Sequence, residues 1–403
     1  MESVLPRLPF QRRGIFDVPQ ELRAMQSGGD LVRVLTAAGD EAWLVTRYED
    51  VRSLLADARL GRSHPAPRDA ARLGNSALST AGPVGSYASE QEDHARYRRR
   101  LTPAFSAKRM RLLRDSTEEV IRETLDTMSG LTPPVDLHQT FSMPVSLHVI
   151  CRLLGVPYED HDLFRSWFEG LAGMADLQKS SEARQAMGAY MAALAERKRD
   201  RPGEDLISDL VGSGDMTLAS PAPGSEAVLD DLSYVAASLL FAGYRTTAIK
   251  IDYGAVLLLA DEGQRAALRA DPALAETAVE EVLRMSSPDH PLLRYAREDL
   301  VISGTTVRAG EAVLLSTLVA NRDPSVFPEP DAFDISRDPN PHLSFGHGPR
   351  LCIGTTLARV EIAAALSMLF ERFPGLRLSV PHEELTRRTD MMMGGLARVP
   401  VEW

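Results

Sequence analysis

The chain has 403 residues, of which 44% are hydrophobic and 25% are charged, and its formal net charge is −11. This composition is ordinary for a soluble globular protein, and the acidic balance argues against nucleic acid as a partner. With only two cysteines, Cys151 and Cys352, a disulfide framework is excluded in practice and a reducing, cytoplasmic location is expected. Residues 1–13 lack the apolar core of a signal peptide, and no stretch approaches 18 uninterrupted apolar residues, so we expect no membrane segment.

Periodicity and turn residues predict a mainly helical chain with a small β region and no reason to split it into separate domains. Cys151 lies in an apolar helical run, which indicates a packing role. In chain order, the predicted elements are strands at 31–34 and 42–45, a helix at 145–154, a Gly/Ser/Pro-rich loop at 211–224, a helix from about 230, a helix at 266–284, a hairpin framed by strands at 300–302 and 313–315, and a helix at 355–373.

The most informative segment has the pattern F-x-x-G-x-x-x-C-x-G, formed by Phe345, Gly348, Cys352 and Gly354. A chance match to four fixed positions in a chain of this length and composition is on the order of 1 in 3,000. A lone thiolate in a glycine-rich turn can ligate haem iron through sulfur, and glycines let the backbone pass close to a flat macrocycle. The alternative is a small cysteine that simply packs beside a turn. We expect Thr355 or Thr356 to cap the following helix, whose first N–H groups would point at the sulfur.

Two other patterns accompany this segment. Glu281 and Arg284 are three residues apart, so they are neighbours on a helix and can pair; a solvated surface ion pair is the alternative. Leu239, Ala242, Gly243 and Thr246 follow helical spacing and share one predicted face. Small residues there would let a planar group approach the backbone, although they also suit a tight crossing of two helices.

Together these patterns resemble those of soluble bacterial cytochromes P450. Three further segments, at 102–105, 153–157 and 320–324, occur in the order found in that family, so the resemblance covers nearly the whole chain. It implies a triangular, helix-rich single domain, residues 1–403, that encloses haem b (iron protoporphyrin IX), with Cys352 as the ligand of the iron.

The resemblance also implies roles for individual residues. Glu281, Arg284 and Arg337 would brace the cysteine loop. Thr246 would be catalytic, because the family's threonine helps to hold iron-bound dioxygen and its protonating water. The residues expected to bind the cofactor are His94, Arg98, Arg294 and Arg350 through the haem propionates, Ala242 and Gly243 on the oxygen side, and Phe345, Cys352 and Gly354 in the loop.

Arg245 departs from the family, which usually has an acid at this position for proton delivery. Some fatty-acid peroxygenases of the family carry an arginine here that anchors a substrate carboxylate, but they also replace the threonine, and this chain keeps Thr246. At 100° per residue, Arg245 lies about 110° from the centre of the small-residue face. We therefore expect it to point sideways, where it alters water access or pairs with an acid elsewhere.

The expected function is oxidation of a mid-sized, largely apolar natural product of secondary metabolism, with O₂ and with electrons from a 2Fe–2S or similar ferredoxin and its reductase. The chain is expected to act as a monomer, without nucleic acid or membrane as a partner. Basic residues in 96–114 are either a solvated helix surface or a docking patch for the ferredoxin.

By analogy with the family, four regions should line the substrate pocket, at 63–89, 163–197, 286–293 and 391–395, with Asp289 and His290 as polar candidates. One alternative function is oxidative C–C or C–N coupling of an aromatic or cyclic-dipeptide substrate without oxygen insertion. Peroxide-driven oxidation is another, and a non-catalytic haem sensor or electron carrier is a third.

Overall fold

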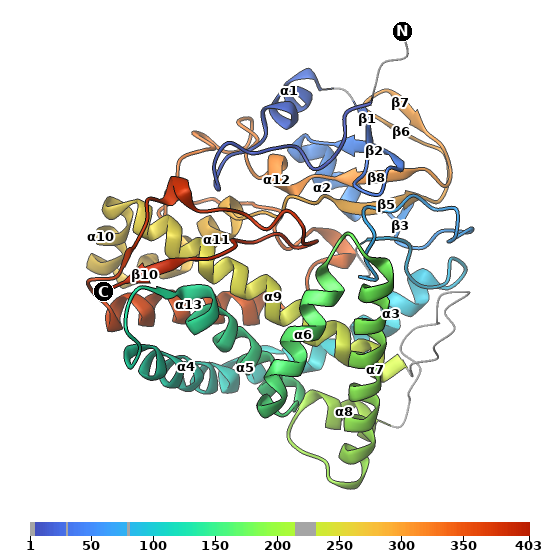
Figure 1. Cartoon of the computed structure of the whole chain (residues 1–403). Coiled ribbons are helices and arrows are strands. Elements are labelled where there is room, and N and C mark those ends of the chain that lie inside the picture. The colour runs from blue at the N-terminus through green and yellow to red at the C-terminus, as the bar shows by residue number, and fades with distance from the viewer. Residues whose placement is uncertain (1–4, 30, 79–80, 214–230) are drawn as a thin grey trace.

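The structure, a computed structural model, describes residues 5–29, 31–78, 81–213 and 231–403. Figure 1 shows most of the labelled strands together at the top, beside the N-terminal part of the described chain, with helices filling the body below them. The predicted fold class, mainly α with a small β region, is therefore confirmed. Within the described residues, no helix combines the length and the apolar character needed to cross a membrane. Beyond residue 213, the predicted loop at 211–224 lies outside the described residues.

The body is built from long helices around one continuous apolar core. They are α4 (Ala107–Ser129), α5 (Met143–Leu154), α6 (His161–Ala172), α7 (Leu177–Asp200), α9 (Asp231–Ala260), α11 (Ala275–Met285) and α13 (Thr355–Arg372). The other helices are α1 (Gln20–Gly28), α2 (Tyr48–Ala56), α3 (Glu90–Leu101), α8 (Leu206–Gly212), α10 (Glu262–Ala270) and α12 (Thr317–Ala320). Cys151 is fully buried in α5, as a packing role requires.

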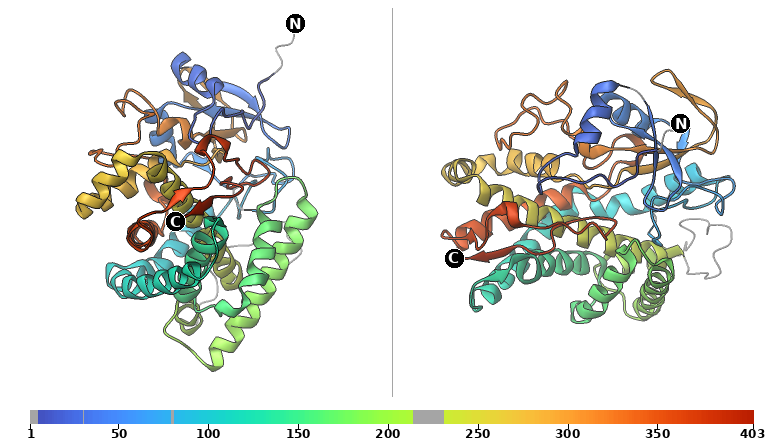
Figure 2. Two further views of the ribbon diagram at one scale, coloured as in Figure 1. Left: turned by 60° about the vertical axis from the view of Figure 1, so that its left-hand side comes forward. Right: turned by 45° about the horizontal axis from the view of Figure 1, so that its top comes forward.

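Helix α9 forms the axis of the body. Its 30 residues span about 45 Å, and it packs against α5, α7, α11 and α13. A helix enclosed on so many sides can be apolar nearly all round. The further views in Figure 2 show the same division of the molecule, with the N-terminal strands on one side and the green helices on the other.

The largest sheet has five strands, in the order β1 (Val32–Leu35), β2 (Glu41–Val45), β8 (Ala312–Leu315), β5 (Leu292–Ala296) and β3 (Leu60–Gly61). The first two form the predicted N-terminal hairpin, in which Val34 pairs with Ala42. The other sheets are a three-stranded one of β4 (Val135–Asp136), β10 (Pro400–Glu402) and β9 (Arg377–Leu378), and the hairpin of β6 (Leu300–Ile302) and β7 (Thr305–Val307).

Two predicted elements are wrong in detail. The helix expected at 266–284 is divided into α10 and α11, because Pro272 lacks an amide hydrogen and starts a new turn that the Asp271 side chain caps. The partner of β6 is β7 rather than 313–315: Ser303 and Gly304, with φ of 47° and 78°, make a two-residue turn between them. Residues 312–315 instead join the large sheet as β8.

Candidate active site

The cysteine loop, residues 345–354, is closed by a hydrogen bond from the Cys352 backbone N–H to the Phe345 carbonyl, 2.9 Å long. Gly346 and Gly348 have φ of +76° and +72°, in the left-handed region that favours glycine. A Cβ atom on Gly348 would also lie 2.8 Å from the Cα of Ala56 in α2. The loop can therefore pack against α2 only with glycine at this position.

Cys352 stands just before α13 and is the exposed cysteine of the chain. The surrounding protein raises the pKa of its thiol by desolvation, while the backbone N–H of Gly354 and the charges of Arg98 and Arg359 lower it. The start of the helix thus offers a hydrogen bond to the sulfur, as expected. The predicted cap is wrong, however: α13 begins at Thr355 with Gly354 at the N-cap and no side-chain cap.

Behind the loop, Glu281 and Arg284 form a fully buried, two-fold hydrogen-bonded pair, with N–O distances of 2.8 and 2.7 Å. Arg337 approaches the same carboxylate at 3.2 Å. Arg284 also donates to the carbonyls of Asn321, Pro330 and Ala332, which belong to the segment leading to the loop. This arrangement fits a brace rather than a solvated surface ion pair.

A second brace was missed in the sequence. Arg359, about one turn into α13, donates to Glu280 at 2.6 and 2.7 Å, and its guanidinium lies 4.8 Å from the centre of the Phe345 ring. His342 contacts the same carboxylate at 3.1 Å. Burial opposes ionisation of Glu280, but Arg359 and His342 together lower its pKa to about 2. The sequence holds no sign of this pair, because its members lie on two helices far apart along the chain.

The four predicted propionate-binding residues converge from α3, β5 and the loop. Burial lowers the pKa of Arg294 to about 9, with Arg62 and Arg350 adding to the effect. Burial likewise lowers the pKa of His94 to about 4, and Arg350, Arg98 and Arg62 lower it further. Arg62 belongs to none of the sequence motifs, so the sequence did not predict that it is part of this cluster.

In the described part of the chain, one carboxylate, that of Glu90, pairs with arginines of this cationic cluster. Glu90 forms ion pairs with Arg350 and, at 3.2 Å, with Arg297. Arg98 donates one N–H to the carbonyl of Leu351, at 3.0 Å. Several cations crowded enough to depress one another's pKa match a ligand that brings two carboxylates. The residues present therefore fit a haem.

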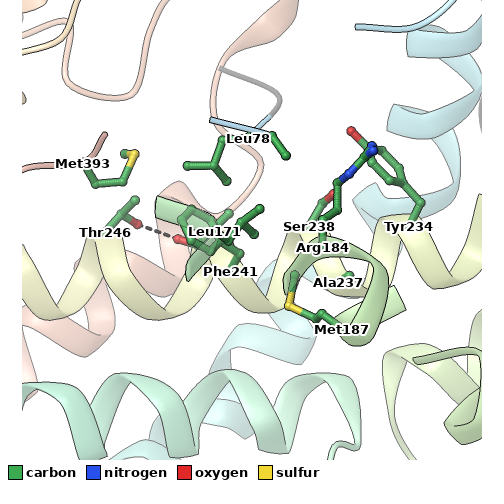
Figure 3. Close-up of a pocket in the computed structure, with 12 residues that line it drawn as sticks. Leu78, Leu171, Arg184, Met187, Tyr234, Ala237, Ser238, Phe241, Thr246 and Met393 are labelled. Carbon is green, nitrogen blue, oxygen red and sulfur yellow. Dashed lines mark hydrogen bonds between the residues drawn. The ribbon is translucent and has the colours of Figure 1, made fainter. Parts of the chain in front are cut away.

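The small residues predicted to share one face of α9 point in two directions, toward a pocket and toward α5. Thr246 and Ala242 face a pocket, and the Thr246 hydroxyl donates to the Ala242 carbonyl at 2.6 Å (Figure 3). Gly243 faces α5 instead, where an added Cβ would lie 2.6 Å from Cδ1 of Ile150. Since the faces differ, the predicted common face is wrong for Gly243, and this glycine serves the tight crossing of α9 and α5.

Arg245 lies away from the pocket lining. Its side chain is 5% exposed and pairs with Glu169 of α6 at 3.1 Å. Glu169 also binds Arg388 at 3.1 Å, and Arg388 in turn binds Asp390 at 3.1 Å. The expectation of a sideways arginine that pairs with an acid agrees with this position. Substrate anchoring by Arg245, the reason for considering a peroxide-driven enzyme, does not.

The pocket beside Thr246 holds about 700 Å³ of space, counting the part that opens to solvent. Its lining comes from Ala77 and Leu78, from Leu171 of α6, from Arg184 and Met187 of α7, from residues of α9 between Tyr234 and Thr246, and from Met393 (Figure 3). Its mostly apolar lining, with a few polar groups, suits an organic ligand of low polarity.

Three of the four predicted regions contribute to this lining, and 286–293 does not. Asp289 is instead bound by Arg12 and Arg387, and burial lowers the pKa of His290 to about 4. Sequence reasoning missed Tyr234, Ser238 and Phe241, although helical spacing from Ala242 could have found them.

Tyr97 of α3 links the pocket, the cysteine and the cationic cluster. Burial raises its pKa to about 12; Tyr234 and Cys352 raise it as well, whereas Arg62 and Arg98 lower it. One partly buried side chain is therefore within electrostatic range of a pocket residue, the candidate iron ligand and two cations. The three parts belong to one site.

The sequence was compared with known families, proteins and structures. The profile of the family described as "Cytochrome P450" matches residues 161–401. Pentalenolactone synthase of Streptomyces exfoliatus is 40% identical, over 98% of this chain and 99% of that protein. Mycinamicin IV hydroxylase/epoxidase of Micromonospora griseorubida is 39% identical over 100% of both chains.

Solved structures give the same result. The mycinamicin VIII C21 methyl hydroxylase MycCI of Micromonospora griseorubida superimposes with a TM-score of 0.88 at 32% identity, covering 99% of this chain and 100% of that one. The LnmA cytochrome P450 hydroxylase of Streptomyces atroolivaceus gives 0.85 at 35% identity, with the same coverage. With the braced cysteine loop and the pocket on α9, these likenesses lead to one conclusion: the chain belongs to the cytochrome P450 family of haem-iron monooxygenases.

Proposed function

We propose that this chain is a haem b monooxygenase that oxidises a mid-sized, largely apolar product of secondary metabolism with O₂ and ferredoxin-derived electrons. The observation that carries the proposal is the exposed Cys352 in its braced loop, within range of the same tyrosine as the apolar pocket. Relatives named for tailoring pentalenolactone and mycinamicin support the substrate class. We further propose that residues 1–403 act as one domain and as a cytoplasmic monomer.

In this proposal Cys352 would supply the sulfur ligand of the iron, and the backbone N–H of Gly354 would favour its thiolate. Arg294, Arg350, Arg98 and His94 would bind the two propionates. When bound, the haem supplies the iron at which dioxygen is activated. The braces on Glu281 and Glu280 hold the loop in position, so that the thiolate keeps its orientation.

On the pocket side, Thr246 holds a hydroxyl beside the substrate space, and its proton is directed to the Ala242 carbonyl. The hydroxyl oxygen can still accept a hydrogen bond and so keep a proton-donating group in place. Arg245 lies outside the described lining of the pocket. It acts as a positioning residue that fixes Glu169, whose half-exposed carboxylate reaches solvent.

Electron transfer is proposed at the face that carries the cysteine loop. Arg98 of the basic segment donates to Leu351, which exposes 40% of its surface next to Cys352. Arg99, on the same helix, is exposed. An apolar contact beside basic side chains suits an acidic iron–sulfur protein, whose approach salt would weaken.

The proposed function is tested by turnover of a panel of apolar terpenoids and macrolides under ¹⁸O₂ with ferredoxin, reductase and NADPH. We expect one ¹⁸O atom in the product and no turnover with peroxide alone. Products without ¹⁸O would favour oxidative coupling, and turnover with peroxide alone would remove the need for a ferredoxin.

The docking face has a separate test. Arg99→Glu should slow reduction by the ferredoxin several-fold at low salt, whereas Arg398→Glu, an exposed arginine with a distant 4.0 Å ion pair, should not. Equal rates in the two variants would place the docking face elsewhere.

A further inference from the structure

The pocket has one charged residue among its described lining residues, Arg184 of α7. Its neighbours on the wall are leucine, methionine, phenylalanine and alanine side chains, with hydroxyl groups only on Tyr234, Ser238 and Thr246. A largely apolar pocket uses a few placed polar groups to fix the orientation of its ligand. A cation in such a wall is therefore a candidate for recognising one group of the substrate.

Arg184 forms no hydrogen bond or ion pair with another described residue, and its Nε–H is buried without a partner. Two other arginines lie near the pocket. Arg245 also leaves its Nε–H buried without a partner, but its guanidinium is held by Glu169, and Arg388 is held by Glu169 and Asp390. Leaving a buried donor unsatisfied costs free energy. The protein retains this cost in its ligand-free form, and a ligand that accepts from Arg184 would remove it.

The position of Arg184 gives the ligand a direction. Figure 3 shows Arg184, Tyr234 and Ser238 toward one end of the pocket, with Thr246 and Met393 toward the other. Ser238 precedes Thr246 by eight residues of α9, which is about 12 Å of helix. A substrate held by Arg184 would thus lay its apolar body along α9 toward Thr246.

From this arrangement we infer that the substrate carries a carboxylate, which Arg184 binds at the end of the pocket remote from Thr246. One guanidinium edge presents two parallel N–H groups that match the two oxygens of a carboxylate. A phosphate brings more charge and more acceptors, and the described lining offers no second cation for it. The oxidised carbon would lie on the order of 10 Å from the acid group, on the apolar part of the molecule.

This inference rests on the proposed function, because it names the substrate class of the same pocket. It is tested with two matched pairs of probes: dodecanoate and methyl dodecanoate, which are flexible, and dehydroabietic acid and its methyl ester, which are rigid. Calorimetry measures their affinity for the haem-loaded wild type and for Arg184→Met and Arg184→Lys. Arg197→Met, an exposed arginine on the same helix, is the matched control.

We expect each acid to bind the wild type about 10- to 100-fold more tightly than its ester, as a charge-assisted pair requires. Arg184→Met should abolish this preference, Arg184→Lys should keep part of it, and Arg197→Met should keep all of it. Equal binding of acid and ester, no binding of either, or a preference that survives in Arg184→Met would each overturn the inference.

The reduced, CO-bound absorption spectrum of every variant separates this outcome from that of the proposed function. A thiolate-haem spectrum without an acid preference would refute the carboxylate alone. If the protein lacked that spectrum but still preferred acids in a way that depends on Arg184, the haem-thiolate function would be refuted. The inference that Arg184 binds a carboxylate would stand.

Discussion

On the cysteine side, the bracing charges have fixed partners: Arg284 with Glu281 is fully buried, and Arg359 is bound twice by Glu280. On the pocket side, Arg245 has a half-exposed partner, and Arg184 has none among the described residues. The difference separates two tasks. A metal ligand must keep one geometry, so its surroundings are closed, whereas a pocket must retain binding capacity for a molecule that comes and goes.

Breaking the closed side should have the largest effect. Arg284→Ala leaves the fully buried Glu281 with the Arg337 and Asn340 side chains and the backbone N–H of Asp334. Because its main cation is lost, we expect a loss of about 3–5 kcal/mol in the free energy of unfolding. Denaturant titration measures this change. Arg372→Ala, whose exposed pair with Asp126 is 3.7 Å long, should cost at most about 1 kcal/mol. Similar losses in both variants would show that the brace adds nothing.

A smaller effect concerns Glu361 of α13, which is 1% exposed. Burial raises its pKa to about 8, so the folded protein keeps this proton at pH values where the unfolded chain loses it. The free energy of unfolding contributed by this group therefore falls as pH rises from about 4.5 to 8. Glu361→Gln should be more stable than the wild type by about 1–3 kcal/mol at pH 8, and by little at pH 4.5. A difference that does not change with pH would contradict the buried, protonated acid.

The smallest effect is expected at the open side. Arg245→Asp sets two carboxylates against each other and should lower the fraction of NADPH use that yields product. The double variant with Glu169→Arg reverses both charges of the pair and should recover part of that fraction, because it also removes the Glu169–Arg388 pair. We expect an interaction energy of about 0.5–1 kcal/mol, since Glu169 is half exposed. Unchanged rate and coupling in Arg245→Asp would refute a positioning role.

The same division explains how far the sequence could be interpreted. The cysteine loop and the Glu281–Arg284 pair are short-range patterns, and a spacing of three residues already places two side chains together on a helix. The Arg245–Glu169 pair joins residues 76 positions apart on two helices, and Arg184 and Tyr234 line the same pocket only because α7 packs against α9. Contacts of this kind depend on how helices cross, which spacing along one helix does not determine.

Local rules also failed where two of them competed. Gly243 satisfied both a haem-facing position and a helix crossing, and only the position of Ile150 decided between them. Thr355 was a suitable cap by residue type, but α13 begins there and Gly354 occupies the cap position. Pro272 ended a periodic apolar pattern that otherwise favoured one long helix.

The central claim is that Cys352 ligates a haem iron, and the reduced, CO-bound absorption spectrum tests it most directly. The haem-loaded wild type should show the Soret band of a thiolate-ligated haem, and Cys352→Ser should lose that band while keeping its helical circular dichroism. A wild type without the band, or a Cys352→Ser variant that retains it, would contradict the account.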